Sequence, residues 1–377
     1  MHKVVFYPVG NGDTSQIILA NGRRLLFDFC HRAKFEEAGT PEIDLRLHLQ
    51  NELRAAKRSA IDVLALTHGD SDHICGSTEF FELRHAAKYQ GGDRIQIEQL
   101  WVPAAMILEE GTRDGQSEEV IIWRQEARHR LREGRGIQVF SRPDKLKDWL
   151  STNGLSVESR RDLMIDAGQV VPGFSLGADG VEFFCHSPFI KHVDEGDDLR
   201  NPCSLIFNVR FQAGPNTFDY LAVGDSEWGV LEDIVATTLA HGRLDRLQWD
   251  LFNDPHHTSY LALSDEKGVM ETKPKPGVEK LLRAGRPGAY IVSSSQPIPD
   301  TAEARAQTMP PHIQARRCYE RYLAEVDGAR FLVTMEEPST RRPEPLVFNI
   351  AGDGITLERA QRSGPSILVS SPAPRAG

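Results

Sequence analysis

The segment from residue 61 to residue 83 places a buried strand, a polar loop and a helix start in direct succession. The apolar run 61–66 is typical of a buried strand, and residues 77–83 are typical of a capped helix start. The loop between them carries His68, Asp70, Asp72 and His73. Two imidazoles and two carboxylates on one short loop are the donors of a metal site, and ordinary packing gives no reason to gather them. The alternative is a solvated polar turn with a capping serine.

The spacing His-x-Asp-x-Asp-His resembles the second motif of the metallo-β-lactamase fold, which usually reads His-x-His-x-Asp-His. Asp70 stands where that fold usually has its second histidine. The same departure marks the hydrolase domain of the competence DNA-uptake protein ComEC and its soluble relatives. The resemblance implies an α/β fold, the metallo-β-lactamase αββα sandwich, in which two mixed β-sheets pack face to face with helices outside.

Three further features, two near the N-terminus and one in the middle of the chain, extend this resemblance. The run from Val9 to Asp13 resembles the opening Val-Gly-Gln-Gly-Asp of ComEC-like domains. Asp28 then falls where this branch has a buried aspartate that orients a metal ligand. Asn201, ahead of a predicted strand, resembles the start of the branch's Asn-x-x-Ser signature, in a place where most of the superfamily has a histidine. The resemblance implies that Asp28 and Asn201 support the metal site from behind.

The remaining motifs follow in the expected order. Gly224-Asp225 closes a predicted strand and matches the fourth motif of the fold, whose carboxylate bridges two metals. The segment 251–259 resembles the strand followed by His-His-Gly-Ser, with Thr258 in place of the glycine. One of His256 and His257 is expected to close the metal site, and the sequence leaves open which one. His312 matches a loop histidine that precedes a final helix, and it is either a substrate-binding or acid group or a surface residue beside prolines.

Together these motifs predict a centre for two divalent metal ions, Zn or Mn. Such a pair lowers the pKa of a water molecule and neutralises charge that develops on a phosphoryl or carbonyl oxygen. The oxygen donors of Asp70 and Asn201 favour a harder ion at one of the two positions. We expect catalytic roles for Asp72 and His312. The predicted metal ligands are His68, Asp70, Asp72, His73, Asp225, His256 and His257.

An arginine-rich helix is predicted from residue 117 to about residue 132, with Gly134 as its stop. Most charge runs of this kind form a solvated helix face. A sharper hypothesis is that Arg124, Arg128 and Arg135 hold an anionic substrate near the metals. Other helices are predicted over 42–58, with Thr40 as the cap and Pro41 as the first helical residue, and over 77–88. The glycine-rich segment 151–180 is predicted to be an insertion or loop.

Length and composition limit the classes of protein to which the chain can belong. The 377 residues suit one domain over 1–360, with a divergent insertion at about 104–200 and a flexible tail over 361–377. An acidic turn is expected over 194–198. The net charge of −10 argues against wrapping long duplex DNA. The five cysteines form no Cys-x-x-Cys pair, and no segment resembles a membrane span or signal peptide. We therefore expect a cytoplasmic protein with reduced thiols.

The function that fits these expectations best is metal-dependent hydrolysis of a phosphodiester in a nucleotide or short nucleic acid. The ligands indicate the reaction type, whereas the choice of a phosphodiester comes mainly from the ComEC resemblance. One alternative is another ester hydrolase on the same fold, of the phosphocholine esterase or lactonase type. A second is a non-catalytic, metal-stabilised subunit of a multi-protein system. Protein partners would then be encoded by neighbouring genes, and the sequence does not indicate the oligomeric state.

Overall fold

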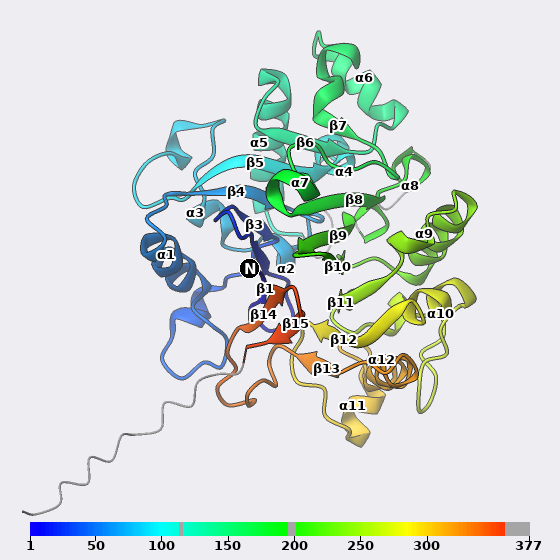
Figure 1. Cartoon of the computed structure of the whole chain (residues 1–377). Coiled ribbons are helices and arrows are strands. Elements are labelled where there is room, and N and C mark those ends of the chain that lie inside the picture. Colours follow the sequence, from blue (N-terminus) through cyan, green and yellow to red (C-terminus); the bar gives the residue numbers. More distant parts are fainter. Residues whose placement is uncertain (113–115, 195–200, 359–377) are drawn as a thin grey trace, which may run out of the picture.

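The computed structural model describes residues 1–112, 116–194 and 201–358. The predicted tail at 361–377 and most of the predicted acidic turn at 194–198 lie outside these residues. Within them, the strands form two mixed sheets that pack face to face and carry helices on their outer faces (Figure 1). The predicted αββα sandwich is confirmed.

The first sheet has nine strands within the described residues, in the order β15-β14-β1-β2-β3-β4-β5-β6-β7. Neighbours from β15 to β3 run antiparallel, and neighbours from β3 to β7 run parallel. The strands are β1 (His2–Phe6), β2 (Ser15–Ile18), β3 (Arg24–Phe27), β4 (Ala60–Ala65), β5 (Gln96–Pro103), β6 (Ile137–Phe140), β7 (Met164–Ile165), β14 (Leu346–Ala351) and β15 (Gly354–Leu357).

The second sheet has six strands within the same residues, in the order β13-β12-β11-β10-β9-β8. Strands β13 to β10 are parallel, and β10, β9 and β8 are antiparallel. The strands are β8 (Val181–Ser187), β9 (Ile206–Ala213), β10 (Asn216–Val223), β11 (Trp249–Asn253), β12 (Gly285–Ser293) and β13 (Arg330–Val333).

The longer helices, together with one helix of five residues, lie in two groups, one over each sheet (Figure 1). The group over the first sheet is α1 (Leu45–Ala55), α4 (Ala104–Leu108), α5 (Glu119–Glu133) and α6 (Asp144–Thr152). The group over the second sheet is α9 (Trp228–Ala240), α10 (Pro276–Leu282) and α12 (Ile313–Glu325). The shorter helices are α2 (Ser71–Ile74), α3 (Ser77–Phe80), α7 (Leu176–Asp179), α8 (Ile190–Asp194) and α11 (Ala302–Ala306). None of the described helices is both long and apolar enough to cross a bilayer.

Three of the four hydrophobic clusters in the described residues correspond to the three interfaces between these layers, and β1 shows why. Successive side chains of a strand point to opposite faces of its sheet. Val4 and Phe6 belong to the cluster between the two sheets, whereas Val5 belongs to the cluster beneath the helices of the first group. The strand is therefore apolar on both faces, as its continuous hydrophobic run predicts.

Two predicted helices have different bounds from those expected. The first begins at Leu45 rather than at residue 42, because the side chain of Asp44 accepts a hydrogen bond from the Leu47 N–H and caps the helix. The helix predicted over 77–88 ends at Phe80, because Phe81 instead forms a parallel bridge with Ile95. The arginine-rich helix is confirmed as α5.

The segment 104–200 contributes outer strands to both sheets. Strands β6 and β7 extend the parallel side of the first sheet, and β8 forms an edge of the second sheet. The segment 151–180, predicted to be an insertion or loop, contains β7 and α7 and is therefore not a loop throughout. Its weak hydrophobic pattern reflects how short both elements are. The division into one domain and a divergent insertion stays a prediction.

Candidate metal centre

The predicted ligands meet at one edge of the sandwich because they follow the carboxyl ends of parallel strands. Asp28 follows β3, and the segment from His68 to His73 follows its parallel neighbour β4. Asp225 follows β10, and the segment 256–257 follows its parallel neighbour β11. The ends of the two sheets therefore bring polar loops from opposite layers into contact.

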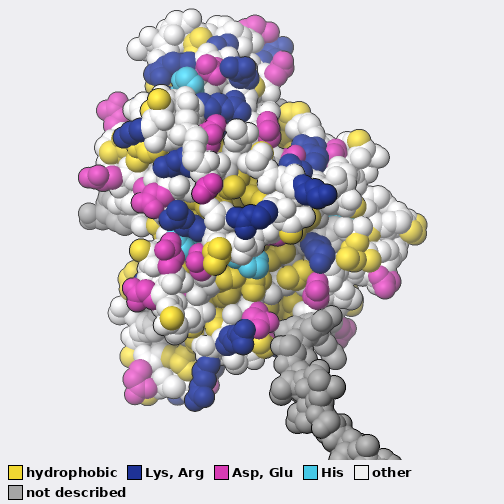
Figure 2. Space-filling model, turned by 90° about the vertical axis from the view of Figure 1, so that its left-hand side faces the viewer, with side chains coloured by type: hydrophobic (Ala, Val, Ile, Leu, Met, Phe, Trp, Pro, Cys, Tyr) yellow, Lys and Arg dark blue, Asp and Glu magenta, His cyan; other side chains and the backbone are white. Residues whose placement is uncertain are grey.

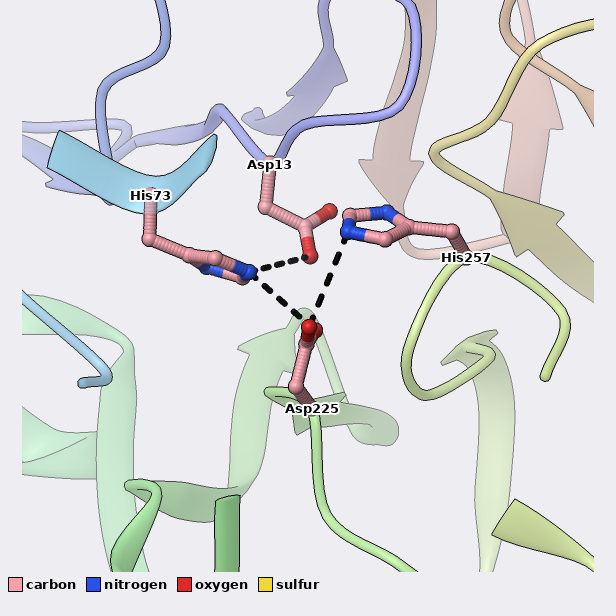
Figure 3. A group of neighbouring side chains, drawn as sticks. All are labelled: Asp13, His73, Asp225 and His257. Carbon is pink, nitrogen blue, oxygen red and sulfur yellow. Dashed lines mark ion pairs between the residues drawn. The ribbon is translucent and has the colours of Figure 1, made fainter. Parts of the chain in front are cut away.

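Four buried side chains converge at this edge: Asp13, His73, Asp225 and His257 (Figure 3). One donor atom from each lies within 4.8 Å of the others. The Nε2 atom of His73 lies 3.2 Å from Asp225 and 3.9 Å from Asp13, and the Nε2 atom of His257 lies 3.6 Å from Asp225. Within the described residues, neither His73 Nε2 nor Asp225 Oδ1 has a well-formed hydrogen bond. Buried donors that face one another without hydrogen bonding suit a shared cation, so these residues fit a metal.

Asp28 fixes the orientation of His73. Its carboxylate accepts hydrogen bonds from the Thr67 N–H at 2.7 Å and the Thr67 hydroxyl at 2.6 Å, and it lies 2.7 Å from His73 Nδ1. A histidine that donates from Nδ1 to a carboxylate presents the lone pair of Nε2 to a metal. The orienting role of Asp28 toward a metal ligand stays a prediction.

His257 is better placed than His256 to complete the cluster. The Nδ1 atom of His257 donates to the Ser294 carbonyl at 2.8 Å, which leaves Nε2 facing Asp225 and Asp72. Its side chain is 2% exposed, compared with 21% for His256, whose Nε2 atom lies 3.8 Å from Asp225. The two histidines approach Asp225 together, but only His257 belongs to the buried cluster of four.

The turn that carries these histidines has an unusual backbone. His256, His257 and Thr258 all have positive φ angles, of 53°, 53° and 63°. This conformation raises the free energy of residues other than glycine, and it persists where the surrounding structure imposes it. The Thr258 hydroxyl donates to Asp254 at 2.6 Å, and the Thr258 carbonyl accepts the N–H of His312 at 3.0 Å. Thr258, which stands in place of the glycine of the motif that the segment resembles, therefore has a left-handed backbone and anchors the turn through its side chain.

A looser group lies on the other side of Asp225. His68 Nε2 is 3.7 Å from Asp70 and 4.0 Å from Asp225, and this buried atom has no hydrogen-bond partner within the described residues. His68 Nδ1 lies 3.1 Å from the Thr67 hydroxyl. His68 and His256 lie 4.0 and 3.8 Å from Asp225 Oδ2, the oxygen that His257 Nε2 approaches to 3.6 Å. They are the residues that could hold a second ion.

Asn201 lies beside the loop that carries Asp225. It begins the 3-10 helix η4 (Asn201–Cys203), and its backbone carbonyl accepts a hydrogen bond from the Ser226 hydroxyl at 3.3 Å. Its side-chain oxygen is buried and has no partner within the described residues. This contact joins η4 to the loop that follows Asp225, and the supporting role of Asn201 stays a prediction.

The charges of the cluster balance one another strongly. Burial lowers the pKa of His257, but the carboxylates of Asp225 and Asp72 outweigh burial and raise this pKa to about 10. Burial also lowers the pKa of His73, but the carboxylates of Asp225 and Asp28 outweigh burial and raise this pKa well above its ordinary value. Burial raises the pKa of Asp225, but the charged imidazoles hold it well below its ordinary value. A divalent cation could replace the imidazole protons as the balancing charge, and its binding would then release protons.

Asp13 is the member of the cluster that sequence reasoning missed. It lies in the loop between β1 and β2, and its N–H donates to the Asp72 carbonyl at 3.1 Å. That hydrogen bond aligns its loop with α2, which carries Asp72 and His73. The available signal was its place as the last residue of the run that resembles the ComEC opening.

The contacts of His312 require a correction to its predicted role. Its Nδ1 atom accepts the Tyr260 N–H at 3.3 Å, and its Nε2 atom donates to the Thr308 carbonyl at 3.2 Å. The side chain is 1% exposed, and burial lowers its pKa to about 4. Both ring nitrogens are used within the protein, so the geometry fits support of the histidine turn rather than acid catalysis.

Of the three arginines predicted to hold an anionic substrate, Arg124 and Arg128 lie in α5 and Arg135 lies just beyond its end. Arg124 is buried and pairs with Glu109 at 3.1 Å, and Arg128 donates to the Ile107 carbonyl at 2.8 Å. Arg135 is exposed and lies 3.3 Å from Glu133. Arg124 and Arg128 are thus turned inward by packing, which a charge count cannot reveal.

The N-terminal end of α5 contacts the metal loop instead. The carboxylate of Glu119 accepts the N–H groups of Gly76 at 2.8 Å and Thr78 at 3.0 Å. A Cβ atom at Gly69 would lie 2.7 Å from the Val120 side chain. The glycine inside the His-x-Asp-x-Asp-His motif therefore allows α5 to approach closely.

Comparisons with known proteins provide distant likenesses. No protein-family model and no curated protein matches the chain. Among solved structures, unliganded yeast PDE1 is 11% identical over 88% of this chain and 97% of its own, with a TM-score of 0.42. A diphosphatase from the PhnP family is 12% identical over 95% of this chain and 100% of its own, with a TM-score of 0.32. A class B3 di-zinc metallo-β-lactamase from an Alaskan soil metagenome is 12% identical over 85% of this chain and 90% of its own, with a TM-score of 0.28. The ComEC branch stays a prediction.

Proposed function

We propose that the chain is a metal-dependent hydrolase that cleaves a phosphodiester in a nucleotide or short nucleic acid. The observation that carries the metal-dependent part is the buried cluster of Asp13, His73, Asp225 and His257, whose donor atoms face one another. The phosphodiester part rests on the motif resemblance, in which Asp70 and Asn201 replace two histidines. Two divalent ions, Zn or Mn, are the proposed cofactors.

Asp72 is the carboxylate of the centre that is open to solvent. Its side chain is 30% exposed, whereas that of Asp225 is 3% exposed. The His257 Nε2 atom lies 3.2 Å from one Asp72 oxygen and orients this carboxylate. Burial raises the pKa of Asp72, but the hydrogen bond with His257 and the charge on His73 outweigh burial and lower this pKa below its ordinary value. We infer that Asp72, the more exposed of these two carboxylates, holds a water molecule at the centre.

Bound divalent ions would make hydroxide available near neutral pH and neutralise charge on the phosphoryl oxygens. The chain's own residues prepare the site for them. Asp28 and Ser294 hold His73 and His257 by Nδ1, and burial keeps Asp13 and Asp225 away from bulk water. Preorganised groups of this kind need little rearrangement when the reaction begins.

A small substrate fits the charge of the molecule better than duplex DNA does. The net charge is −10, and the face in Figure 2 shows basic side chains interspersed with acidic ones. Duplex binding calls for clustered basic residues, because affinity depends on neutralising many phosphates. A nucleotide or a short strand needs only one phosphodiester at the metal centre.

The experiment is reconstitution of metal-stripped protein with Zn²⁺ or Mn²⁺, assayed on bis(p-nitrophenyl) phosphate and p-nitrophenyl acetate. We expect turnover of the phosphodiester to need metal and to exceed turnover of the carboxylester. Asp72→Asn should lower this turnover, whereas Asp353→Asn, at an exposed turn, should leave it unchanged.

Three outcomes would contradict the proposal in different ways. Preferential hydrolysis of the carboxylester would favour the other ester hydrolases of this fold. Stoichiometric metal binding without turnover of either compound would favour a metal-stabilised subunit of a larger assembly. An equal rate in metal-stripped and metal-loaded protein would refute the metal-dependent reaction itself.

A further inference from the structure

Two cysteine thiols lie in contact directly behind the metal loop. The Sγ atoms of Cys30 and Cys75 are 3.1 Å apart. Cys30 is two residues beyond Asp28, and Cys75 is two residues beyond His73. The thiol pair therefore lies beside the hydrogen bond that orients His73.

Backbone hydrogen bonds hold the two cysteine segments side by side. The Phe29 N–H donates to the His73 carbonyl at 2.8 Å, and the His31 N–H donates to the Cys75 carbonyl at 2.9 Å. These bonds hold the backbones of the two cysteines side by side. A disulfide needs the sulfur atoms about 2.05 Å apart, which this pair could reach by a shift of about 1 Å.

The thiol pair also contacts the loop that carries Asp13. A Cβ atom at Gly12 would lie 2.6 Å from the Cys30 sulfur and 3.0 Å from the Asp72 carbonyl. The Cys30 N–H donates to the Thr14 hydroxyl at 2.9 Å. A shift of Cys30 is therefore transmitted to the segments on both sides of Asp13.

The surroundings give the two cysteines different reactivity. Cys30 is fully buried, whereas Cys75 is partly exposed and has the Arg32 guanidinium beside it. Reactive cysteines are typically accessible and lie near positive charge. Cys185 and Cys203 instead donate to backbone carbonyls in the interior. Cys75 is thus the thiol that an oxidant can reach, and Cys30 is its neighbour.

We propose that Cys30 and Cys75 form a redox-active pair that a peroxide converts into a disulfide, and that this disulfide weakens metal binding. The Cys75 thiolate attacks one peroxide oxygen, which breaks the O–O bond, gives a sulfenic acid and releases hydroxide that takes up a proton as water. The Cys30 sulfur then attacks the Cys75 sulfur, and the sulfenic oxygen leaves as a second water. The pair loses two electrons and hydrogen peroxide gains them. A dithiol reductant reverses the change.

Weaker metal binding follows from the place of the pair. Closing the sulfur–sulfur gap pulls on the segments that hold Asp28, His73 and Asp13. Disturbing groups that orient metal ligands typically lowers metal affinity by about 10- to 100-fold. We expect a loss in this range on oxidation.

The experiment treats the full chain with hydrogen peroxide and counts its thiols after denaturation. Wild type should fall from five thiols to three, and a digest should contain a peptide pair joined through Cys30 and Cys75. Cys75→Ser should form no internal disulfide. Cys318→Ser, a matched change at a buried site in α12, should still lose two thiols. Dithiothreitol should restore the original count.

A Zn²⁺ titration by competition with a chromophoric chelator then compares the reduced and oxidised proteins. An unchanged thiol count, or a Cys75 sulfinic acid without a link to Cys30, would overturn the redox pair. Equal Zn²⁺ affinity in both forms would overturn its coupling to the metal centre. If the reduced protein bound no metal, the metal centre and the coupling would both fail, while the thiol count would still decide the disulfide.

Discussion

The two sides of Asp225 differ in how firmly the protein holds them. On one side, His73 and His257 approach Asp225 to 3.2 and 3.6 Å, and each donates from Nδ1 to a fixed partner. On the other side, His68 and His256 stand at 4.0 and 3.8 Å. His256 is partly exposed, and its buried Nδ1 atom has no partner within the described residues.

This difference has a physical consequence for metal binding. A preorganised site loses little freedom when the ion binds, whereas a loose site must order its ligands at that moment. We therefore expect two ions with unequal affinity, the tighter one between Asp13, His73, Asp225 and His257.

Removing Asp225 should have the largest effect, because both sides share this carboxylate. Asp225→Ala should abolish binding of both ions and reduce any hydrolysis to the background. Metal content by elemental analysis after gel filtration measures the change, with Asp353→Ala as the control at an exposed turn. Retention of one equivalent of metal would show that the two sides do not depend on a common bridge.

Replacing each of the two adjacent histidines by alanine should affect the two ions separately. His257→Ala removes a member of the buried cluster and should eliminate the tighter ion. His256→Ala should leave the tighter ion in place and affect only the weaker one. Calorimetric titration with Zn²⁺ measures both affinities, and the two variants are matched controls for each other. The reverse outcome would assign the ligand role to His256.

Asp28→Asn tests how far preorganisation accounts for the tighter side. Asp28 accepts from three donor groups at 2.6 to 2.7 Å, and an amide cannot accept from all of them. We expect affinity for the tighter ion to fall by about 10- to 100-fold, with little change in overall secondary structure. The same titration measures it. A normal affinity would mean that packing alone orients His73.

The sequence predicted the groups that lie close together along the chain. His68 to His73 form one loop, and Asp28 and Asp225 each end a recognisable strand. Asp13 could not be singled out, because a lone aspartate in a glycine turn is common and its role depends on the hydrogen bond to the Asp72 carbonyl. Such a contact depends on strand pairing across the sheet rather than on local sequence.

The choice between His256 and His257 and the fate of the arginines depended on tertiary structure in other ways. Three successive positive φ angles turn His257 toward Asp225. The local sequence does not predict them, because none of the three residues is a glycine. Arg124 points inward because Glu109 is buried opposite it. Helical spacing identified the charged helix, but it did not show which charges the fold would enclose.

A buried imidazole outside the metal centre should respond to pH in the opposite way to His73 and His257. His186, in β8, donates to the Arg246 carbonyl at 2.9 Å, and burial lowers its pKa from 6.5 to about 4. The folded state keeps this ring neutral, while the unfolded state binds a proton below pH 6.5. Its contribution to stability is therefore present above pH 6.5 and is lost as the pH falls toward 4. Between pH 7 and pH 5 we expect a loss of about 2 kcal/mol from this group.

Urea unfolding of wild type and His186→Gln at pH 7 and pH 5 measures that loss. The glutamine keeps an N–H donor for the Arg246 carbonyl but does not titrate in this range. The variant should therefore lose less stability between the two pH values than wild type does. An identical loss in both proteins would show that His186 binds its proton equally in the folded and unfolded states.

The smallest effect should come from Asp70, on the looser side. Its carboxylate lies 3.7 Å from His68 Nε2 and replaces an imidazole usual in the fold. Oxygen donors suit Mn²⁺, whereas imidazole favours Zn²⁺. Asp70→His should therefore raise the ratio of Zn²⁺ to Mn²⁺ affinity at the weaker site by about tenfold, or about 1.4 kcal/mol. The tighter site should keep its preference, because none of its four ligands changes. Parallel titrations with both ions measure the ratio, with Asp353→His as the control. A shift at the tighter site instead would place Asp70 among its ligands and would remove the asymmetry between the two sides.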